Sequence, residues 1–232
     1  MQLIHLNWES LSILEKEESF KLKYSDFERR YNPHRYATMC KSEAGQMHLL
    51  MKQIFLNVPV QKILENYPKL ANCINVIQLQ LQEIFRLNTS EQVHQDYTVQ
   101  LLWENCLIWS EIDLVVINPE KSEFRCINWT WNEGNVPTEA TIQQHWKTQL
   151  PLFLLTKNYN LAPESLSFTY WFVNGCSNTS VEYNFDYNTA QFNSFFERLH
   201  KTLQKLSTMQ PEIKNPNEYY LRLAQEAPEV EI

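Results

Sequence analysis

One acid, Asp113, lies within the apolar run IDLVVI, and two polar residues follow it on the next expected strand. They are Asn128 and Thr130, which are separated by one residue in the stretch FRCINWTW. Because alternate residues of a strand point to the same face, both side chains are expected on one side of a sheet. Hard cations such as Mg²⁺ prefer carboxylate oxygens, whereas an amide offers only a neutral oxygen. A cation site built on these positions would therefore hold a single carboxylate.

The composition is that of a folded domain, and it excludes several kinds of binding protein. The 232 residues are 44% hydrophobic and 13% aromatic, which is enough for one well-buried core. Only three glycines occur, and neither GxGxxG nor GxxxxGKS/T is present, so we exclude a nucleotide cofactor held by a glycine-rich loop. The formal net charge of −7 disfavours a surface that coats DNA, because duplex affinity comes largely from neutralised phosphates. A local basic groove is still compatible with this charge.

The cysteines and the N-terminal residues favour a cytoplasmic protein without a membrane partner. The five cysteines are odd in number, scattered and without CxxC spacing, which is typical of reduced thiols. The first ten residues, MQLIHLNWES, lack the basic flank and apolar run of a signal peptide. No apolar stretch approaches the roughly 20 residues that span a bilayer.

Helical periodicity gives way to strand periodicity near residue 92 and then alternates with it. Ser42 is expected to cap a strong helix, because its hydroxyl can accept from the first turn. The expected helices cover about 7–20, 42–57, 69–87, 138–155 and 189–209, with a further helix between Pro59 and Pro68. The expected strands lie in 94–103, 105–117, 123–131, 165–175 and 180–188. This order predicts one α/β (α+β) domain with a central mixed sheet flanked by helices. We expect a domain over 1–208, with a mostly helical part over 1–90 and the sheet over 91–208, followed by an acidic tail over 209–232.

The order of elements and four local motifs resemble the RecB-type branch of the PD-(D/E)XK nuclease superfamily, especially its small stand-alone members. The family's Gly-x-x-[aromatic or Met]-His element corresponds to Gly45-Gln46-Met47-His48, and its apolar strand with an Asp corresponds to Ile112-Asp113-Leu114. Its Asp-Trp-Lys-Thr strand corresponds to Asn128-Trp129-Thr130-Trp131, and its helical Gln corresponds to Gln149. The resemblance spans about residues 1–208. It implies a restriction-endonuclease-like fold.

The resemblance also implies a metal-dependent phosphodiester hydrolase site with two parts missing. Family members use Mg²⁺ or Mn²⁺, held by two acids, and a lysine that orients the attacking water. The implied metal ligands here are His48 and Asp113, and the implied catalytic positions are Asp113, Asn128, Thr130 and Gln149. A unit charge contact near 4 Å is worth about 4 kcal/mol at an effective dielectric of 20, so losing one carboxylate weakens metal binding severely. We expect a catalytically inactive or weak protein, with Mg²⁺ or Mn²⁺ needed only if activity remains.

The family's iron–sulfur variant is excluded by the positions of the cysteines. Those members carry one cysteine before the helical region and three near the C-terminus. Residues 1–39 and 177–232 contain no cysteine, so we expect no iron–sulfur cluster and no other cofactor.

Several residues allow a second interpretation. Asp113 could be a hydrogen-bonded structural acid, His48 an ordinary helix histidine and Gln149 a solvent-facing side chain. Lys147 or Glu133 could replace the missing groups from shifted positions.

Two segments could contact nucleic acid. The basic stretch with Arg29, Arg30 and Arg35 is the best candidate for phosphate contacts, and its alternative is a solvated loop. The aromatic strand 169–172 could stack bases, but its side chains are expected to fill the core.

Three functions remain open at this point. The chain could be a nuclease-fold protein that lost catalysis and retains DNA binding, or an active Mg²⁺-dependent nuclease with a rearranged site. It could also be a protein-interaction module without a role on nucleic acid, which the acidic balance favours slightly.

Overall fold

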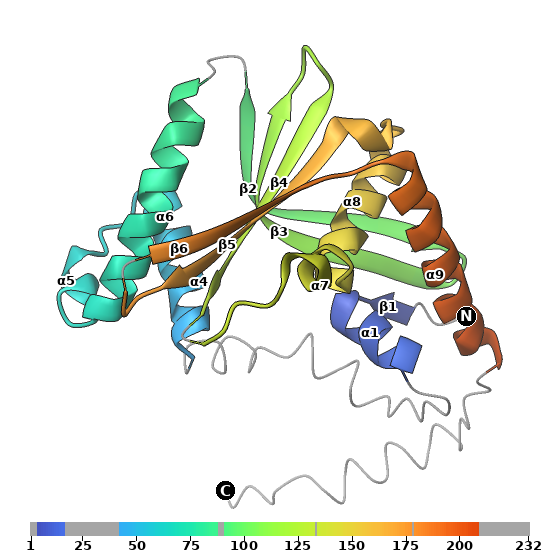
Figure 1. The fold of residues 1–232 in the computed structure, drawn as a ribbon, viewed down its shortest axis with the longest axis horizontal. Coiled ribbons are helices and arrows are strands. Elements are labelled where there is room, and N and C mark those ends of the chain that lie inside the picture. Colours follow the sequence, from blue (N-terminus) through green and yellow to red (C-terminus); the bar gives the residue numbers. More distant parts are fainter. Residues whose placement is uncertain (1–3, 17–41, 88–90, 133, 178, 209–232) are drawn as a thin grey trace, which may run out of the picture.

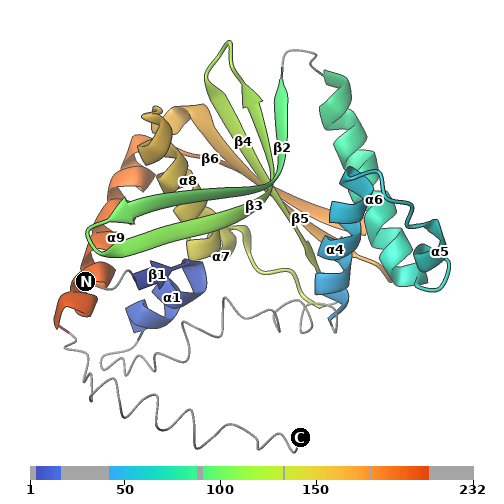
Figure 2. The same cartoon turned by 180° about the vertical axis from the view of Figure 1, so that it is seen from behind.

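The computed structural model describes residues 4–16, 42–87, 91–132, 134–177 and 179–208. A single six-stranded mixed sheet runs through the molecule, with helices on both faces, as Figures 1 and 2 show from opposite sides. The strands are β1 (Ile4–Leu6), β2 (Gln92–Trp103), β3 (Cys106–Asn118), β4 (Glu123–Trp131), β5 (Leu166–Asn174) and β6 (Thr179–Asp186). The predicted fold class is confirmed. The basic stretch with its three arginines and the acidic tail lie outside the described residues.

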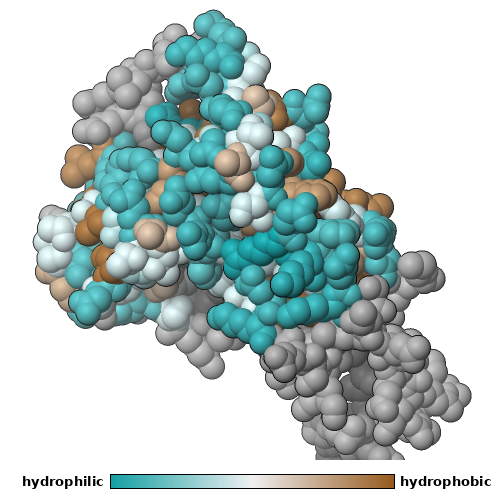
Figure 3. Space-filling model, turned by 45° about the vertical axis from the view of Figure 1, so that its right-hand side comes forward, coloured by the Kyte–Doolittle hydropathy of each residue, from teal (hydrophilic) through white to brown (hydrophobic). Residues whose placement is uncertain are grey.

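Seven α-helices and one short 3-10 helix flank the sheet in the described ranges. They are α1 (Trp8–Lys16), α4 (Glu43–Phe55), α5 (Gln61–Leu64), α6 (Pro68–Leu87), α7 (Glu139–Gln143), α8 (Trp146–Tyr159), α9 (Thr189–Thr208) and η1 (Pro163–Ser165). The helices α4 and α6 cover one face of the sheet, and α1, α8 and α9 cover the other (Figure 1). Within these ranges, no helix is both long and apolar enough to cross a membrane. Polar side chains dominate the face drawn in Figure 3.

Each face of the sheet has its own hydrophobic core. The α8-side core joins the sheet to α1, α8 and α9 and includes Leu11, Ile112, Trp146, Phe153 and Phe168. The α6-side core joins it to α4 and α6 and includes Met47, Met51, Ile74, Leu114 and Trp129. The aromatic strand 169–172 is buried within these cores, so the core interpretation of that strand is confirmed.

Near the middle of β2 and of β3, side chains two residues apart point to opposite faces of the sheet. On β3, Ile112 belongs to the α8-side core and Leu114 to the α6-side core, although the period of a strand would give both the same face. On β2, Tyr97 packs on the α8-side core and Val93 on the α6-side core. The change falls at Asp113 on β3, opposite Asp96 of β2, where the β2–β3 ladder skips one pair and Asp96 has a φ of 47°.

The sheet divides at the same level. One edge of β3 pairs with β2 along its length, and the other edge pairs in two pieces. It pairs with β1 over Cys106–Ile108 and with β4 over Leu114–Asn118. Between those pieces, β4 diverges from β3 and continues as the parallel neighbour of β5. In the part of the chain that the structure describes, residues 109–113 therefore face a gap on this edge, which we call the split.

The helix expected over 138–155 is divided into α7 and α8, and this correction has a local cause. His145 is the N-cap of α8, and its Nδ1 accepts from the N–H of Lys147 at 3.2 Å. Thr148 Oγ1 and Gln149 Nε2 donate to carbonyl oxygens at the end of α7, both at 2.6 Å. Gln149 thus satisfies a carbonyl at the end of α7, and Thr148 gives a second donor to the carbonyl of Ile142, which also accepts from the N–H of His145 at 3.1 Å.

Candidate functional site

Asp113 lies at the split and connects the two diverging strands. Its backbone N–H donates to Oδ1 of Asn128 at 2.8 Å, and its Oδ2 accepts from the backbone N–H of Trp129 at 3.0 Å. The last backbone pair of the β3–β4 ladder is Leu114 with Ile127. The two side chains therefore extend the connection one step beyond the point where the backbone ladder ends.

His48 reaches Asp113 from the α6 side of the sheet. Its Nδ1 lies 3.2 Å from Oδ1 of Asp113, and the two side chains are 23% and 19% exposed. The imidazole stacks on Trp129 with ring centroids 6.3 Å apart. Ser42 caps α4 by accepting from the N–H of Gly45 at 3.1 Å, as the sequence predicted, and so fixes the turn from which His48 projects.

Asn128 is buried and also takes part in a network on the α8 side. Tyr170 is the neighbour of Asn128 on strand β5, and its hydroxyl lies close enough to the side chains of Asn128 and Thr148 for both to lower its pKa, against the larger effect of burial, which raises it. The Oγ1–H of Thr148 donates to the carbonyl of Ile142 at 2.6 Å, which holds this side chain beside the ring of Tyr170. Because Oδ1 of Asn128 is taken by Asp113, its amide N–H₂ is the group that can donate to Tyr170.

Lys147 approaches the split from the first turn of α8. Its Nζ lies 5.8 Å from the centroid of the Tyr170 ring. Burial lowers the pKa of Lys147, but Tyr170, Asp113, Glu9 and Glu111 raise it, and the net pKa lies above the ordinary value. Lys147 is therefore a charged ammonium among acidic groups.

The same groups set the ionisation of Asp113. Burial raises the pKa of this carboxyl, whereas His48, Lys147 and the N–H of Trp129 lower it, and the net pKa lies below the ordinary value of 3.8. Asp113 is thus a carboxylate at neutral pH, with protein groups around both of its oxygens.

The other predicted site residues are placed less centrally. Thr130 is two residues beyond Asn128 on β4, is partly buried and pairs with Phe172 of β5. Gln149 is buried and donates to the carbonyl of Gln143, so its amide is engaged at the α7–α8 junction. Asp113, Asn128 and His48 are the predicted residues that the structure brings into direct contact. Arg29, Arg30, Arg35 and Glu133 lie outside the described residues.

The residues at the split do not fit a catalytic Mg²⁺ or Mn²⁺ ion in this arrangement. Such ions take about six oxygen ligands, and carboxylates supply the charge. Here the two oxygens of Asp113 face His48 and the N–H of Trp129, and the oxygen of Asn128 accepts from Asp113. Over the described ranges, no three His, Cys, Asp or Glu side chains lie together as a metal site would need.

Sequence reasoning missed two of the groups that define this site. Tyr170 was assigned to the core, and it is buried, but its hydroxyl also contacts Asn128. The parallel pairing of Asn128 with Tyr170 joins residues 42 positions apart, and no local pattern reports it. The role of Thr148 depends on the helix break, for which His145 as an N-cap was the available signal.

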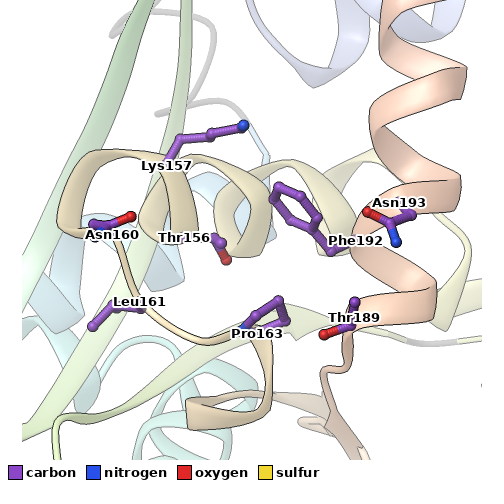
Figure 4. Close-up of a pocket in the computed structure, with 8 residues that line it drawn as sticks. All are labelled: Thr156, Lys157, Asn160, Leu161, Pro163, Thr189, Phe192 and Asn193. Atoms are coloured by element: carbon purple, nitrogen blue, oxygen red, sulfur yellow. The ribbon is translucent and has the colours of Figure 1, made fainter.

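A cavity of about 290 Å³ lies away from the split, between the end of α8 and the start of α9 (Figure 4). Lys157 at its wall holds Nζ over the ring of Phe192, 5.2 Å from the centroid. The start of α9 is occupied by Glu164, whose Oε1 accepts from the N–H and the hydroxyl of Thr189, both at 2.8 Å. Lys157 is ten residues beyond Lys147, roughly 15 Å along the helix.

Comparisons with known proteins give no family assignment for this chain. No family model matches it, and no curated protein matches it significantly. Two solved structures are similar in outline. The protein SSO0001 aligns over 98% of this chain and 87% of its own, at 12% identity and a TM-score of 0.38. A candidate exonuclease from Eubacterium rectale aligns over 82% of this chain and 77% of its own, at 9% identity and a TM-score of 0.42. At these values neither match identifies an activity.

Proposed function

We propose that this chain is a RecB-type PD-(D/E)XK nuclease-like protein that has lost phosphodiester cleavage and retains a binding role. The family motifs in the sequence support the first part, because their residues on α4, β3 and β4 meet at one split in the sheet. The loss of cleavage is supported by the hydrogen bonds that already occupy these side chains: Asn128 accepts from the backbone of β3, and Asp113 accepts from the backbone of β4. A catalytic cation would have to displace those contacts with only one carboxylate to attract it.

The charges around the split also support a loss of cleavage. Lys147 lies within electrostatic reach of Asp113, Glu9 and Glu111, and these acids raise the pKa of its ammonium. Without a bound dication, these carboxylates repel a phosphodiester. Nucleic acid, if it is the partner, is therefore expected to bind through a surface other than the split.

A second candidate function is an active metal-dependent nuclease in which Lys147 replaces the missing lysine. The position of Lys147 favours it, because its Nζ lies 5.8 Å from the centroid of the Tyr170 ring and its charge lowers the pKa of Asp113. It still lacks the second carboxylate that the family uses. The two candidates differ in whether the natural sequence cuts.

The decisive experiment incubates the protein with labelled single- and double-stranded DNA in Mg²⁺ or Mn²⁺. We expect no cleavage above the level of the Asp113→Ala variant. Robust cleavage by the natural sequence that disappears in Asp113→Ala would overturn the proposal. If the single variant Lys147→Met also fails to cleave, the second candidate would be established. Lys157→Met is the matched control, because it removes an ammonium at the far end of the same helix.

Restoring the family residues tests the relic hypothesis directly. The double variant Asn128→Asp, Thr130→Lys regains the acid and the lysine on adjacent same-face positions of β4. We expect metal-dependent cleavage to appear in this variant, and no gain would count against an ancestral nuclease site. A DNA mobility-shift assay at several salt concentrations separates DNA binding from a role in protein interaction, because phosphate contacts weaken steeply with salt.

A further inference from the structure

The polar groups at the split satisfy one another in a continuous chain that crosses the sheet. On the α6 side, His48 meets Oδ1 of Asp113 at 3.2 Å. Within the sheet, the N–H of Asp113 donates to Asn128 at 2.8 Å. On the α8 side, Asn128 pairs with Tyr170 in the β4–β5 ladder, and the hydroxyl of Tyr170 lies within the influence of the side chains of Asn128 and Thr148. Two helices from opposite layers are thereby connected through one pair of strand residues.

These side-chain contacts lie at the level of the sheet where β3 and β4 are no longer joined by backbone hydrogen bonds. The β3–β4 ladder stops at Leu114 and Ile127; beyond it, among the described residues, β4 keeps only β5 as a neighbour, and β3 has no partner on this edge until it pairs with β1. The N–H groups of Asp113 and Trp129 would lack a partner there without the two side chains. A buried N–H without a partner costs as much as a lost hydrogen bond or more.

We propose that His48, Asp113, Asn128 and Tyr170 form a structural brace that holds β3 against β4 beyond the end of their ladder. This inference rests on the proposed function in one respect: it assigns a structural role to residues that, under the proposed function, no longer bind a cation. It makes the cluster part of the folding core of the protein.

The brace predicts an effect on stability opposite to that of a working cation site. Carboxylates that are gathered to bind a cation repel one another, and functional residues of this kind are often held at a cost to stability. Removing such an acid tends to stabilise the protein. Removing Asp113 from a brace has the reverse effect, since it leaves Trp129 N–H without an acceptor and His48 and Lys147 without their carboxylate.

The test measures the melting temperature of Asp113→Ala and Tyr170→Phe in the presence of EDTA. We expect each to lower Tm by about 3 to 10 °C, as the loss of one or two buried hydrogen bonds does in a domain of this size. Asp186→Ala and Tyr67→Phe are matched controls, because both side chains are exposed, and we expect shifts within about 1 °C. A Tm of Asp113→Ala equal to or above that of the natural sequence overturns the brace.

The double variant distinguishes a brace from two independent core residues. Because Asp113 and Tyr170 act through Asn128, the Tm loss in the double variant should be smaller than the sum of the single losses. Additive Tm losses would show that Asp113 and Tyr170 are not energetically coupled. If Asp113→Ala does not fold, Asp113→Val, which also lacks an acceptor for Trp129 N–H, replaces it under the same criteria. These outcomes are independent of cleavage: DNA cutting overturns the proposed function, whereas only the Tm data decide the brace.

Discussion

The backbone N–H of Asp113 donates to the side chain of Asn128 across the point where β3 and β4 diverge, at 2.8 Å. The carboxylate of Asp113 reciprocates by accepting from the next residue of β4, Trp129, at 3.0 Å. An aspartate at position 128 could accept the same N–H, but it would place a second carboxylate beside the first. The neutral amide therefore suits a site that holds no dication, and its N–H₂ additionally serves Tyr170.

Truncating the amide should destabilise the protein strongly. In Asn128→Ala, the N–H of Asp113 and the hydroxyl of Tyr170 each lose a buried partner, so we expect the free energy of unfolding to fall by about 2 to 4 kcal/mol. Urea unfolding followed by tryptophan fluorescence measures it. Asn193→Ala is the control, because Asn193 is exposed on α9, and it should change the value by less than about 0.5 kcal/mol. Equal effects of the two variants would contradict the assigned contacts.

A second set of contacts holds α1 and α9 against α8. Arg198 donates from Nε and Nη2 to the carboxylate of Glu15, both at 2.6 Å, and its guanidinium lies 4.4 Å from the centroid of the Trp146 ring. Trp146 Nε1 donates to the same carboxylate at 2.8 Å. We expect Glu15→Ala to cost about 1 to 3 kcal/mol, because it leaves the indole N–H and a partly buried guanidinium without their acceptor. A cycle with Arg198→Ala should show coupling of at least about 0.5 kcal/mol, and additive single effects would refute the pairing.

The same pair predicts a dependence on acid. The hydrogen bond from Arg198 is the main cause that holds the pKa of Glu15 below its ordinary 4.5. A carboxyl whose folded pKa is depressed stabilises the fold above its unfolded pKa, and this contribution is lost as pH falls through the folded value. The stability difference between the natural sequence and Glu15→Gln should therefore shrink as pH falls below about 4.5, measured by urea unfolding. A difference that stays constant down to pH 3 would contradict the prediction.

His145 should make the α7–α8 junction sensitive to pH in a higher range. Its Nδ1 accepts from Lys147 N–H, which requires the neutral ring, and burial is the main cause that lowers its pKa below the ordinary 6.5. The unfolded chain then binds the proton more readily, so stability is complete above about pH 6.5 and decreases as pH falls below it. Melting curves between about pH 5 and 8 should show this decrease. His145→Asn keeps an N-cap acceptor without titrating, and it should flatten the curve over that interval.

The elements that depend on local periodicity could be predicted from the sequence. The helix begun by Ser42 and the strand containing Asp113 have caps and apolar patterns that act within a few residues, and the structure places both as expected. The short strand β1 was not predicted, because its three residues pair with β3 about 100 positions away. The division between α7 and α8 before Trp146 was not predicted either, because the helical spacing of apolar residues continues across it. The division is fixed by the hydrogen bonds that the side chains of His145 and Thr148 make there.

Three residues of the site, His48, Asp113 and Asn128, could be predicted from the sequence, whereas Tyr170, Thr148 and the contacts between these residues could not. Motif spacing identified His48 and Asp113, and the structure brings their side chains to 3.2 Å. The change of faces on β2 and β3 coincides with a φ of 47° at Asp96 and a missing Asp96–Asp113 pair in the ladder, which the apolar pattern of neither strand reports. Tyr170 joins the site only because β5 lies parallel to β4 in this register.

A glycine far from the split offers the sharpest steric prediction. Gly175 follows β5 and faces the start of α6, where a Cβ built on it would lie 2.4 Å from the carbonyl oxygen of Lys69. Its own carbonyl accepts from Asn72 Nδ2 at 3.0 Å, so the loop cannot withdraw without losing that bond. We expect Gly175→Ala to lower the free energy of unfolding by about 1 to 3 kcal/mol, because the clash is with backbone and overpacking of this kind forces a shift. Gly134→Ala is the matched control: its nearest neighbour would be 3.9 Å away, which is ordinary contact, and urea unfolding should show a change below about 0.5 kcal/mol. If the two alanine variants unfold at the same urea concentration, the close packing of Gly175 against α6 is refuted.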